Sequence, residues 1–214
     1  ISTEGGIIKR KFTAGLRQPT GIILFGDKIY LVERGNLVEV DKNSGEILTR
    51  YPIPDCRFPN DIASDGSGTL YITDNEANRI YRYNGGVISI NMQDGEIIKP
   101  NGIEYYENSL YVGCSGDATI KRIDMATGEV ETLASLPAGS VMDGLQVTEK
   151  GEILFSDFTG HLFKLDKSGK PEELVNTVTT GVNLADFEYL EGKGIIIVPG
   201  LYSNYLVAYR IGSN

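Results

Sequence analysis

Short apolar runs separated by turn residues recur along the whole chain, and no helical periodicity of 3.6 residues is evident. One such run opens each of five similar segments, and its third residue falls at Thr20, Asn60, Asn101, Asp143 and Ala185. These positions are 40, 41, 42 and 42 residues apart. A period this constant over the length of a chain indicates an internal structural repeat.

Each repeat continues with further apolar runs, and several of the third runs lead into a turn that ends at glycine, such as Asp41–Gly45. The second runs are Lys28–Val32, Thr69–Thr73, Ser109–Gly113, Glu152–Ser156 and Gly194–Val198. The third runs are Asn36–Asp41, Arg79–Asn84, Thr119–Asp124, His161–Asp166 and Tyr205–Arg210. Fourth runs include Glu46–Tyr51, Glu129–Ala134 and Glu172–Asn176. Four strands in about 41 residues are typical of a propeller blade, so we predict an all-β, five-bladed β-propeller.

The two ends of the chain indicate how the ring closes. The last repeat has only three runs and stops near Ile211, whereas Ile7–Thr13 is a strand-like run without a blade of its own. We expect this N-terminal strand to complete the last blade, because closure removes exposed sheet edges. Residues 1–214 then form a single propeller domain. The alternative is a six-bladed propeller that lacks one blade, and a start at Ile1 rather than Met indicates processing or trimming.

The first strand of each blade lines the central channel of a propeller. Asn60, Asn101 and Asp143 open neighbouring blades, so we expect their side chains to converge at the channel mouth, with Asp61 and Asp186 nearby. Carboxylate and amide oxygens suit hard cations such as Ca²⁺. The spacing therefore favours a cation site, although Asn and Asp before Gly are also ordinary turn residues.

Three of the openings resemble motifs of the senescence-marker-protein, gluconolactonase and luciferin-regenerating-enzyme family. They are Pro59-Asn60-Asp61, Pro100-Asn101-Gly102 and Asp143-Gly144-Leu145. The resemblance implies a six-bladed propeller that holds one divalent cation, most often Ca²⁺, and hydrolyses sugar lactones. It implies that Asn101 and Asp143 are metal ligands and that Asn60 binds the metal or its water and the substrate. The cation would polarise the lactone carbonyl, and Asp143 would assist as a base.

Two positions depart from the pattern of that family. Thr20 stands where the family has a glutamate ligand, which lowers the expected affinity for a cation. Arg57 lies three residues before Asn60, whereas the family places an arginine two residues before. We expect Arg57 and Thr20 to contact the substrate. The sequence thus predicts a cation-dependent hydrolase of a lactone or small ester, and the alternative is a non-catalytic propeller that binds a ligand or a protein.

The net charge and the distribution of apolar residues limit the classes of partner that this chain is expected to bind. A net charge of -9, from 20 basic and 29 acidic residues, argues against nucleic acid and anionic membrane surfaces. No apolar run approaches the roughly 20 residues of a membrane span. We therefore expect a small-molecule substrate or ligand, or a protein partner, with no membrane insertion. A periplasmic or secreted location is favoured over the cytoplasm.

The remaining chemistry-bearing residues are assigned to structure. His161 is the only histidine, which excludes a multi-histidine metal site, and we expect it to lie away from the channel. Cys56 and Cys114 are predicted to be free thiols, with a single disulfide as the alternative. Tyr30, Tyr71 and Tyr111 hold equivalent positions and are predicted to pack between blades. Asp74 and Asp157 end second strands, where we expect them to bind neighbouring backbone.

Overall fold

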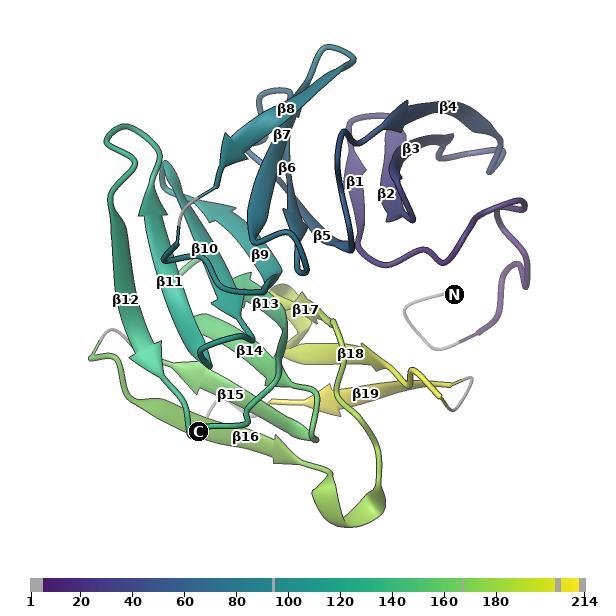
Figure 1. Cartoon of the computed structure of the whole chain (residues 1–214). Coiled ribbons are helices and arrows are strands. Elements are labelled where there is room, and N and C mark those ends of the chain that lie inside the picture. The colour runs from purple at the N-terminus through teal and green to yellow at the C-terminus, as the bar shows by residue number, and fades with distance from the viewer. Residues whose placement is uncertain (1–5, 94, 167, 203–204, 212–214) are drawn as a thin grey trace.

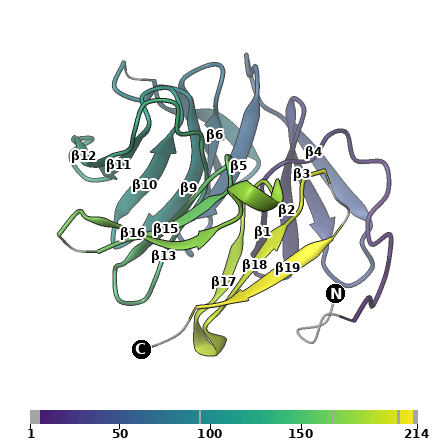
Figure 2. The ribbon, with the colours of Figure 1, turned by 90° about the horizontal axis from the view of Figure 1, so that it is seen from below.

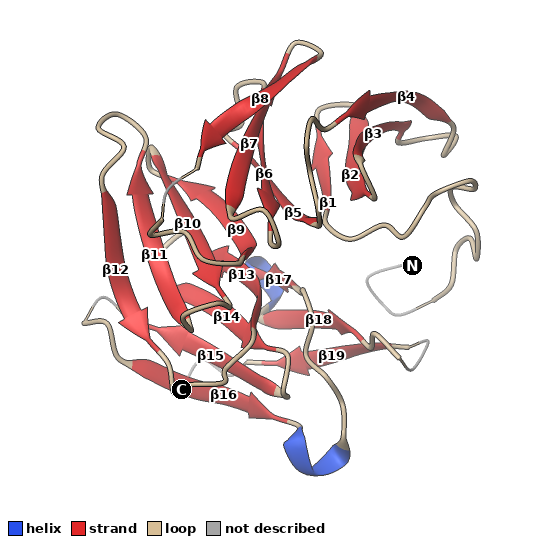
Figure 3. Cartoon of the chain, viewed as in Figure 1, coloured by secondary structure: helices blue, strands red, loops and turns tan. Residues whose placement is uncertain are grey.

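The computed structural model describes residues 6–93, 95–166, 168–202 and 205–211, and regular structure within them is almost entirely β-strand (Figure 3). The strands form five antiparallel sheets placed around a central axis (Figure 1). Each chain segment passes from the axis outward, strand by strand, before it enters the next sheet. The predicted five-bladed β-propeller is therefore confirmed.

The four-stranded blades follow the chain order. Blade 1 contains β1 (Ile22–Phe25), β2 (Lys28–Glu33), β3 (Asn36–Asp41) and β4 (Ile47–Pro52). Blade 2 contains β5 (Pro59–Ser64), β6 (Thr69–Asp74), β7 (Arg79–Asn84) and β8 (Val87–Met92). Blade 3 contains β9 (Pro100–Tyr106), β10 (Ser109–Cys114), β11 (Thr119–Asp124) and β12 (Val130–Ser135). Blade 4 contains β13 (Met142–Val147), β14 (Ile153–Asp157), β15 (His161–Leu165) and β16 (Pro171–Asn176).

The fifth blade is smaller. It contains β17 (Glu188–Leu190), β18 (Ile195–Pro199) and β19 (Leu206–Arg210), which are the strands of its sheet among the described residues. Two short 3₁₀-helices, Val178–Thr180 and Glu191–Lys193, lie before and within this blade. Figure 2 shows the β17–β19 sheet on one side of the axis, with blade 1 beyond it. The predicted second strands agree with β2, β6, β10, β14 and β18 to within one residue at each end.

The predicted closing strand is the part of the fold that was wrong. Ile7–Thr13 forms no strand and does not pair with β19. The chain that follows is anchored to blade 1 instead, because the fully buried Glu33 carboxylate accepts hydrogen bonds from Arg17 N and Arg50 Nε, both at 2.8 Å. Arg50 Nη2 also donates to Gly15 O at 2.8 Å. A buried charge needs these partners, and supplying them holds the segment on blade 1.

Hydrophobic clusters join consecutive blades from the first to the fifth. Tyr30 and Val32 of blade 1 pack with Ile62 and Ile72 of blade 2. Blade 2 meets blade 3 through a cluster that includes Ala63, Tyr71, Ile80, Ile103, Leu110 and Val112. Blade 3 meets blade 4 through Ile120, Ala134, Met142, Leu145 and Phe155. Blade 4 meets blade 5 through Leu154, Leu162, Leu184, Phe187 and Ile196. The tyrosines Tyr30, Tyr71 and Tyr111 are all part of these contacts, as predicted.

Hydroxyl side chains add polar links between blades. Thr73 Oγ1 accepts a hydrogen bond from Asp61 N at 3.0 Å and donates to Asn101 O of blade 3 at 2.8 Å. Ser156 holds the equivalent position in blade 4, where its Oγ donates to Ala185 O at 2.8 Å. Both hydroxyls are fully buried, so each satisfies backbone groups that have no access to water.

The two aspartates at the ends of second strands bind backbone, as predicted. Asp74 accepts hydrogen bonds from Arg57 N and Phe58 N, both at 2.8 Å. Asp157 accepts from Val141 N at 3.3 Å. In each case the carboxylate fixes the loop that leads into the first strand of the same blade.

Candidate functional site

A cavity of about 350 Å³ lies at the axis, where the first strands of the blades meet. Its acidic lining residues are Asp61, Glu104, Asp186 and Glu188, and Gln146 lies among them. The rest of its lining is mainly aliphatic, and no Lys, Arg or His takes part. The lining of this cavity therefore combines acidic and apolar side chains.

The repeat places these carboxylates at two levels of the channel. Asp61 and Asp186 follow the third residue of their openings directly, and Gly21, Gly102 and Gly144 hold the same position in the other blades. A Cβ at Gly21 would lie 2.7 Å from Asp61 Oδ1, and one at Gly144 would lie 2.7 Å from Asp186 Oδ1. The glycines therefore make room for the carboxylate of the next blade. Glu104, Gln146 and Glu188 all lie three residues after the corresponding third residue.

Backbone donors orient some of these groups. Asp61 is 8% exposed, and its carboxylate accepts hydrogen bonds from Ile62 N at 2.8 Å and from Ile103 N of the next blade at 2.9 Å. Asp186 Oδ1 accepts from its own neighbour, Phe187 N, at 2.8 Å. Gln146 Oε1 accepts from Tyr189 N of blade 5 at 2.8 Å, which leaves its Nε2 as the donor end of the amide.

Burial and mutual repulsion disfavour the charged forms of these carboxyl groups. Burial raises the pKa of Glu104 to about 7, and the nearby charges of Glu188 and Asp186 add to this effect. Burial also raises the pKa of Asp186 to about 6. The pKa of Asp61 is raised by burial and by repulsion from Asp186. A carboxyl group that titrates near neutral pH can both take up and release a proton at that pH.

The residues predicted to bind a cation, Asn60, Asn101 and Asp143, are not among the lining residues of this cavity. Asn101 is 8% exposed, and its side chain lies beside Asp143. Burial and repulsion from Asp186 raise the pKa of Asp143 to about 7, while the hydrogen bond from Asn101 opposes that rise. Within the described part of the chain, Asn101 Oδ1 is a buried oxygen that has no hydrogen-bond partner. The structure thus brings Asn101 and Asp143 together, as the sequence predicted.

The fit of this site to Ca²⁺ is incomplete. No group of three or more His, Cys, Asp or Glu side chains that could hold a metal ion occurs among the described residues. Asn60, the third predicted ligand, is half-buried, and its backbone oxygen accepts a hydrogen bond from Gly21 N at 2.7 Å. The unpartnered Asn101 Oδ1 and the Asp143 carboxylate are suitable hard donors, but seven or so are usual for Ca²⁺.

The two predicted substrate-binding residues lie together in another hollow. Thr20 and Arg57 are exposed and line a depression of about 360 Å³ between blades 1 and 2. Thr20 also borders the central cavity, whereas Arg57 does not. The structure therefore separates Arg57 from the channel carboxylates.

His161 and the cysteines take no part in the channel. His161 Nδ1 lies 2.7 Å from Glu173 Oε1 on the outer strands of blade 4. Cys56 and Cys114 are both free, as predicted. Burial raises the pKa of the Cys114 thiol to about 12, so this thiol is unreactive at neutral pH.

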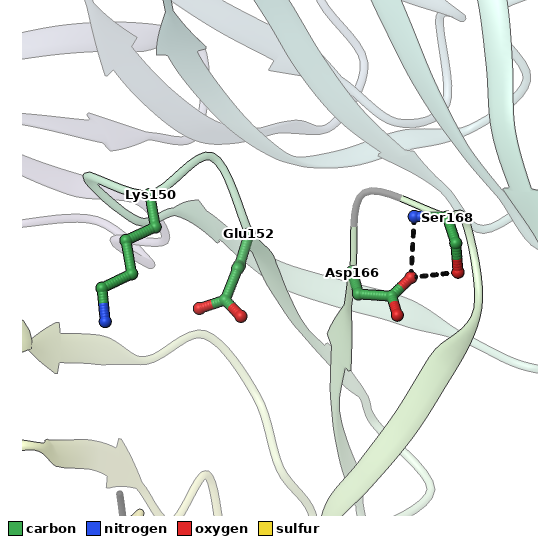
Figure 4. Close-up of a pocket in the computed structure, with 4 residues that line it drawn as sticks. All are labelled: Lys150, Glu152, Asp166 and Ser168. Atoms are coloured by element: carbon green, nitrogen blue, oxygen red, sulfur yellow. Dashed lines mark hydrogen bonds between the residues drawn. The ribbon is translucent and has the colours of Figure 1, made fainter.

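A further hollow, of about 400 Å³, lies at the periphery of blade 4 and is lined by Lys150, Glu152, Asp166 and Ser168 (Figure 4). Asp166 Oδ1 accepts hydrogen bonds from Ser168 N at 2.8 Å and Ser168 Oγ at 2.6 Å, drawn as dashed lines in Figure 4. These bonds lower the pKa of Asp166. The carboxylate is thus engaged within its own turn, and the hollow mixes charges of both signs.

Glu104, Gln146 and Glu188 were missed as candidates. The sequence does contain a signal for them. Their common repeat position is aliphatic in the first two blades, at Ile23 and Ala63, and polar in the last three blades. Polar residues at an aligned position of the channel strands are expected to meet at the axis.

Comparison with protein families gives one match, to the family described as glutamine cyclotransferase, over residues 20–154. That match covers more than half of the chain. Comparison with curated protein sequences gives no match. The senescence-marker-protein and gluconolactonase family that the openings resemble is not the family matched.

Solved structures share the fold at low sequence identity. A chain of a nidogen/laminin complex has a TM-score of 0.77 and 17% identity, covering 90% of this chain and 76% of that chain. Virginiamycin B lyase from Staphylococcus aureus has a TM-score of 0.70 and 17% identity, covering 90% of this chain. This chain spans 64% of the lyase, less than two thirds of its length. A gluconolactonase from Xanthomonas campestris has a TM-score of 0.69 and 20% identity, covering 85% and 69% of the two chains. At such identities the likeness establishes the propeller fold alone.

No helix among the described residues is long and apolar enough to cross a membrane.

Proposed function

This chain belongs to the glutamine cyclotransferase family, and we propose that it cyclises an amino-terminal glutamine in its central cavity, with release of ammonia. The observation that carries the proposal is the cavity lining, which contains Asp61, Glu104, Asp186 and Glu188 and no basic residue. An α-amino group has a pKa of about 7.7–8.0, so a free amino terminus is largely cationic at neutral pH. Clustered carboxylates attract such a group, whereas a neutral lactone gains nothing from their charge.

Glu104 is the proposed acid and base. Its pKa of about 7 means that about half of the groups are ionised at neutral pH and can accept a proton from the substrate ammonium. The freed amine then attacks the γ-carbonyl carbon, and a new carbon–nitrogen bond closes the five-membered ring. The old γ-amide bond breaks, and the protonated Glu104 returns its proton to the departing nitrogen. The α-nitrogen loses two protons in all, and these leave with the ammonia as ammonium.

Neighbouring groups support this step. Gln146 Oε1 accepts a hydrogen bond from Tyr189 N, which fixes the orientation of the side-chain amide. Its Nε2 is then available to donate a hydrogen bond to the negative charge that develops on the γ-oxygen. Asp186, with a pKa of about 6, is mostly ionised at neutral pH and provides the attraction for the ammonium. Asp61 is held by two backbone donors and keeps the two blades in place around the substrate.

The test measures ammonia release from a dipeptide amide that begins with glutamine. We expect the wild-type protein to release ammonia and Glu104→Gln to lower kcat by about 10²–10⁴-fold, the usual contribution of a general acid or base. Gln at this position can still accept the hydrogen bond that Tyr105 N donates to Glu104 Oε1. The matched control is Glu129→Gln, an exposed residue of the same blade. The kcat/KM of wild type should rise with pH through about 7 as Glu104 ionises.

A second peptide separates cyclisation from amide hydrolysis. The same dipeptide amide with an acetylated amino terminus has no nucleophilic amine, so a cyclase releases no ammonia from it. Equal ammonia release from both peptides contradicts the proposal, as does a Glu104→Gln protein with full activity.

The second candidate is cation-dependent hydrolysis of a lactone or small ester at the channel mouth. The observation that favours it is the unpartnered, buried Asn101 Oδ1 beside Asp143. Asn101 and Asp143 would hold the cation, proposed to be Ca²⁺, which supplies Lewis-acid activation when bound. Asn60, Thr20 and Arg57 would contact the substrate, Asn60 would orient the attacking water, and Asp143 would deprotonate it.

Thermal unfolding across a Ca²⁺ titration tests this second candidate directly. A ligand present at a hundred times its dissociation constant stabilises the folded state by about 2.7 kcal/mol. A saturable rise in Tm that is absent in Asp143→Asn, together with lactone hydrolysis, supports it. A flat titration contradicts it. If no ammonia and no lactone product is formed, the remaining hypothesis is a non-catalytic propeller that binds a ligand or a protein.

A further inference from the structure

One wall of the central cavity is apolar and belongs to the first and last blades. We call Ile22, Ile197, Pro199 and Leu206 the apolar wall. Ile22 lies on β1, Ile197 and Pro199 lie on β18, and Leu206 lies on β19. The carboxylates of the same cavity lie on blades 2 and 3 and at the start of blade 5. Blade 5 is also the blade whose second and third strands reach the cavity.

Ile22 holds a repeat position that is buried in the other blades. The equivalent residues Ile62, Ile103, Leu145 and Phe187 are 4%, 2%, 5% and 8% exposed, whereas Ile22 is 63% exposed. Leu206, across the cavity, is 45% exposed. No hydrophobic cluster of the described residues includes members of both blade 1 and blade 5. Figures 1 and 2 show these two blades as neighbours around the axis.

An acidic group beside an apolar surface that no other described residue covers suits a ligand that combines a cation with an apolar group. We propose that the cavity selects peptides whose second residue is apolar, and that this side chain covers the apolar wall. The inference rests on the proposed function, because the amino-terminal residue is then held by the carboxylates while the next residue faces blades 1 and 5. Charge complementarity sets the orientation of the bound peptide, because its ammonium group is attracted to Glu104 and Asp186.

The expected preference follows from burial of the second side chain. Removing a leucine side chain from water favours binding enough to raise kcat/KM by about 10–50-fold over serine. The probes are glutaminyl-leucine amide and glutaminyl-serine amide, which carry the same amino terminus and the same charge. The quantity of interest is the ratio of their kcat/KM values.

Two wall variants and one control test the proposal. We expect Ile22→Ser and Leu206→Ser each to lower the leucine-to-serine ratio to below about threefold. Both residues are substantially exposed, so neither change removes a core contact. The control is Leu48→Ser, a 46%-exposed leucine on the outer strand of blade 1, which should keep the wild-type ratio. Equal kcat/KM values for the two peptides in wild type overturn the inference and leave the proposed function intact.

Failure of the proposed function gives a different set of results from failure of this inference. If wild type releases ammonia from neither peptide, titration calorimetry with the same two amides still measures the preference. Tighter binding of the leucine amide that is lost in Ile22→Ser would support the apolar subsite in a protein that does not cyclise glutamine. Equal binding of the two amides, or no binding, overturns the inference. Sedimentation of wild type and Ile22→Ser tests whether a second copy of this chain occupies the apolar wall instead. Self-association that Ile22→Ser abolishes means that a second copy covers the wall, which also overturns the inference.

Discussion

The joint between blades 2 and 3 and the opening between blades 5 and 1 are built from equivalent residues with opposite results. At the joint, Asp61 accepts a hydrogen bond from Ile103 N, and the Ile103 side chain is buried in a cluster shared by the two blades. At the opening, Asp186 holds the place of Asp61, and Ile22 holds the place of Ile103. There Asp186 accepts from its own neighbour Phe187, and Ile22 is exposed.

The difference shows that a repeat position has no fixed role of its own. The same aspartate and the same aliphatic residue seal an interface when another blade packs against them. They become the acidic and apolar walls of a cavity where the described residues bring no blade into contact. Stability is then expected to depend on the joints between consecutive blades, from blade 1 to blade 5. Ligand selection is expected to depend on the opening between blades 5 and 1.

The largest effect expected from this contrast is on the hydrophobic packing. Ile72 is fully buried in the cluster between blades 1 and 2, so Ile72→Ala should lower the free energy of unfolding by about 2–5 kcal/mol. Ile22→Ala removes the same atoms from an exposed site and should cost less than about 0.5 kcal/mol. Thermal or urea unfolding measures both. Similar losses for the two variants would mean that Ile22 is covered in solution.

The next effect concerns pH, because the carboxyl groups of the cavity are more easily protonated in the folded chain than in the unfolded one. The pKa of Glu104 rises from 4.5 to about 7 on folding. The folded state therefore binds more protons between these values, and stability falls as pH rises from about 4.5 to about 7. Above pH 7 the cost is fully present, on the order of 2 kcal/mol for this group after allowance for its partial exposure to water.

Glu104→Gln removes that cost together with the proposed catalytic group. We expect its Tm at pH 8 to exceed that of wild type by a few degrees, and its Tm to fall less between pH 5 and pH 8. Glu129→Gln should follow wild type. A Glu104→Gln protein that loses stability at pH 8 would show that the carboxylate is compensated in the folded state.

The sequence sufficed for the blades because each strand is a short apolar run bounded by turn residues and the runs recur with a constant period, so local pattern and tertiary role agree. Ile7–Thr13 is also a short run that contains apolar residues, yet it forms no strand. Its position depends on the buried Glu33, whose need for the Arg17 backbone N–H could not be read from a pattern. Local periodicity states what a segment can form, and competition between tertiary partners decides whether it does.

The site was predicted in part for a related reason. Aligned openings correctly indicated that Asn101 and Asp143 lie together. Glu104, Gln146 and Glu188 were missed because only the residues that begin each repeat were aligned. Their common position lies three residues further along the channel strands, where three blades carry a polar side chain.

The smallest of the three effects isolates the polar link at the closed joint. Thr73→Val keeps the shape of the side chain but removes the hydroxyl that joins Asp61 N to Asn101 O. Two buried backbone groups then lose a partner, so we expect a loss of about 1–2 kcal/mol in the free energy of unfolding. Thr49→Val on the exposed face of β4 is the matched control and should change it by less than about 0.5 kcal/mol. A Thr73→Val protein as stable as wild type would contradict a role for the hydroxyl in joining blades 2 and 3, and would leave the hydrophobic cluster as the main link between them.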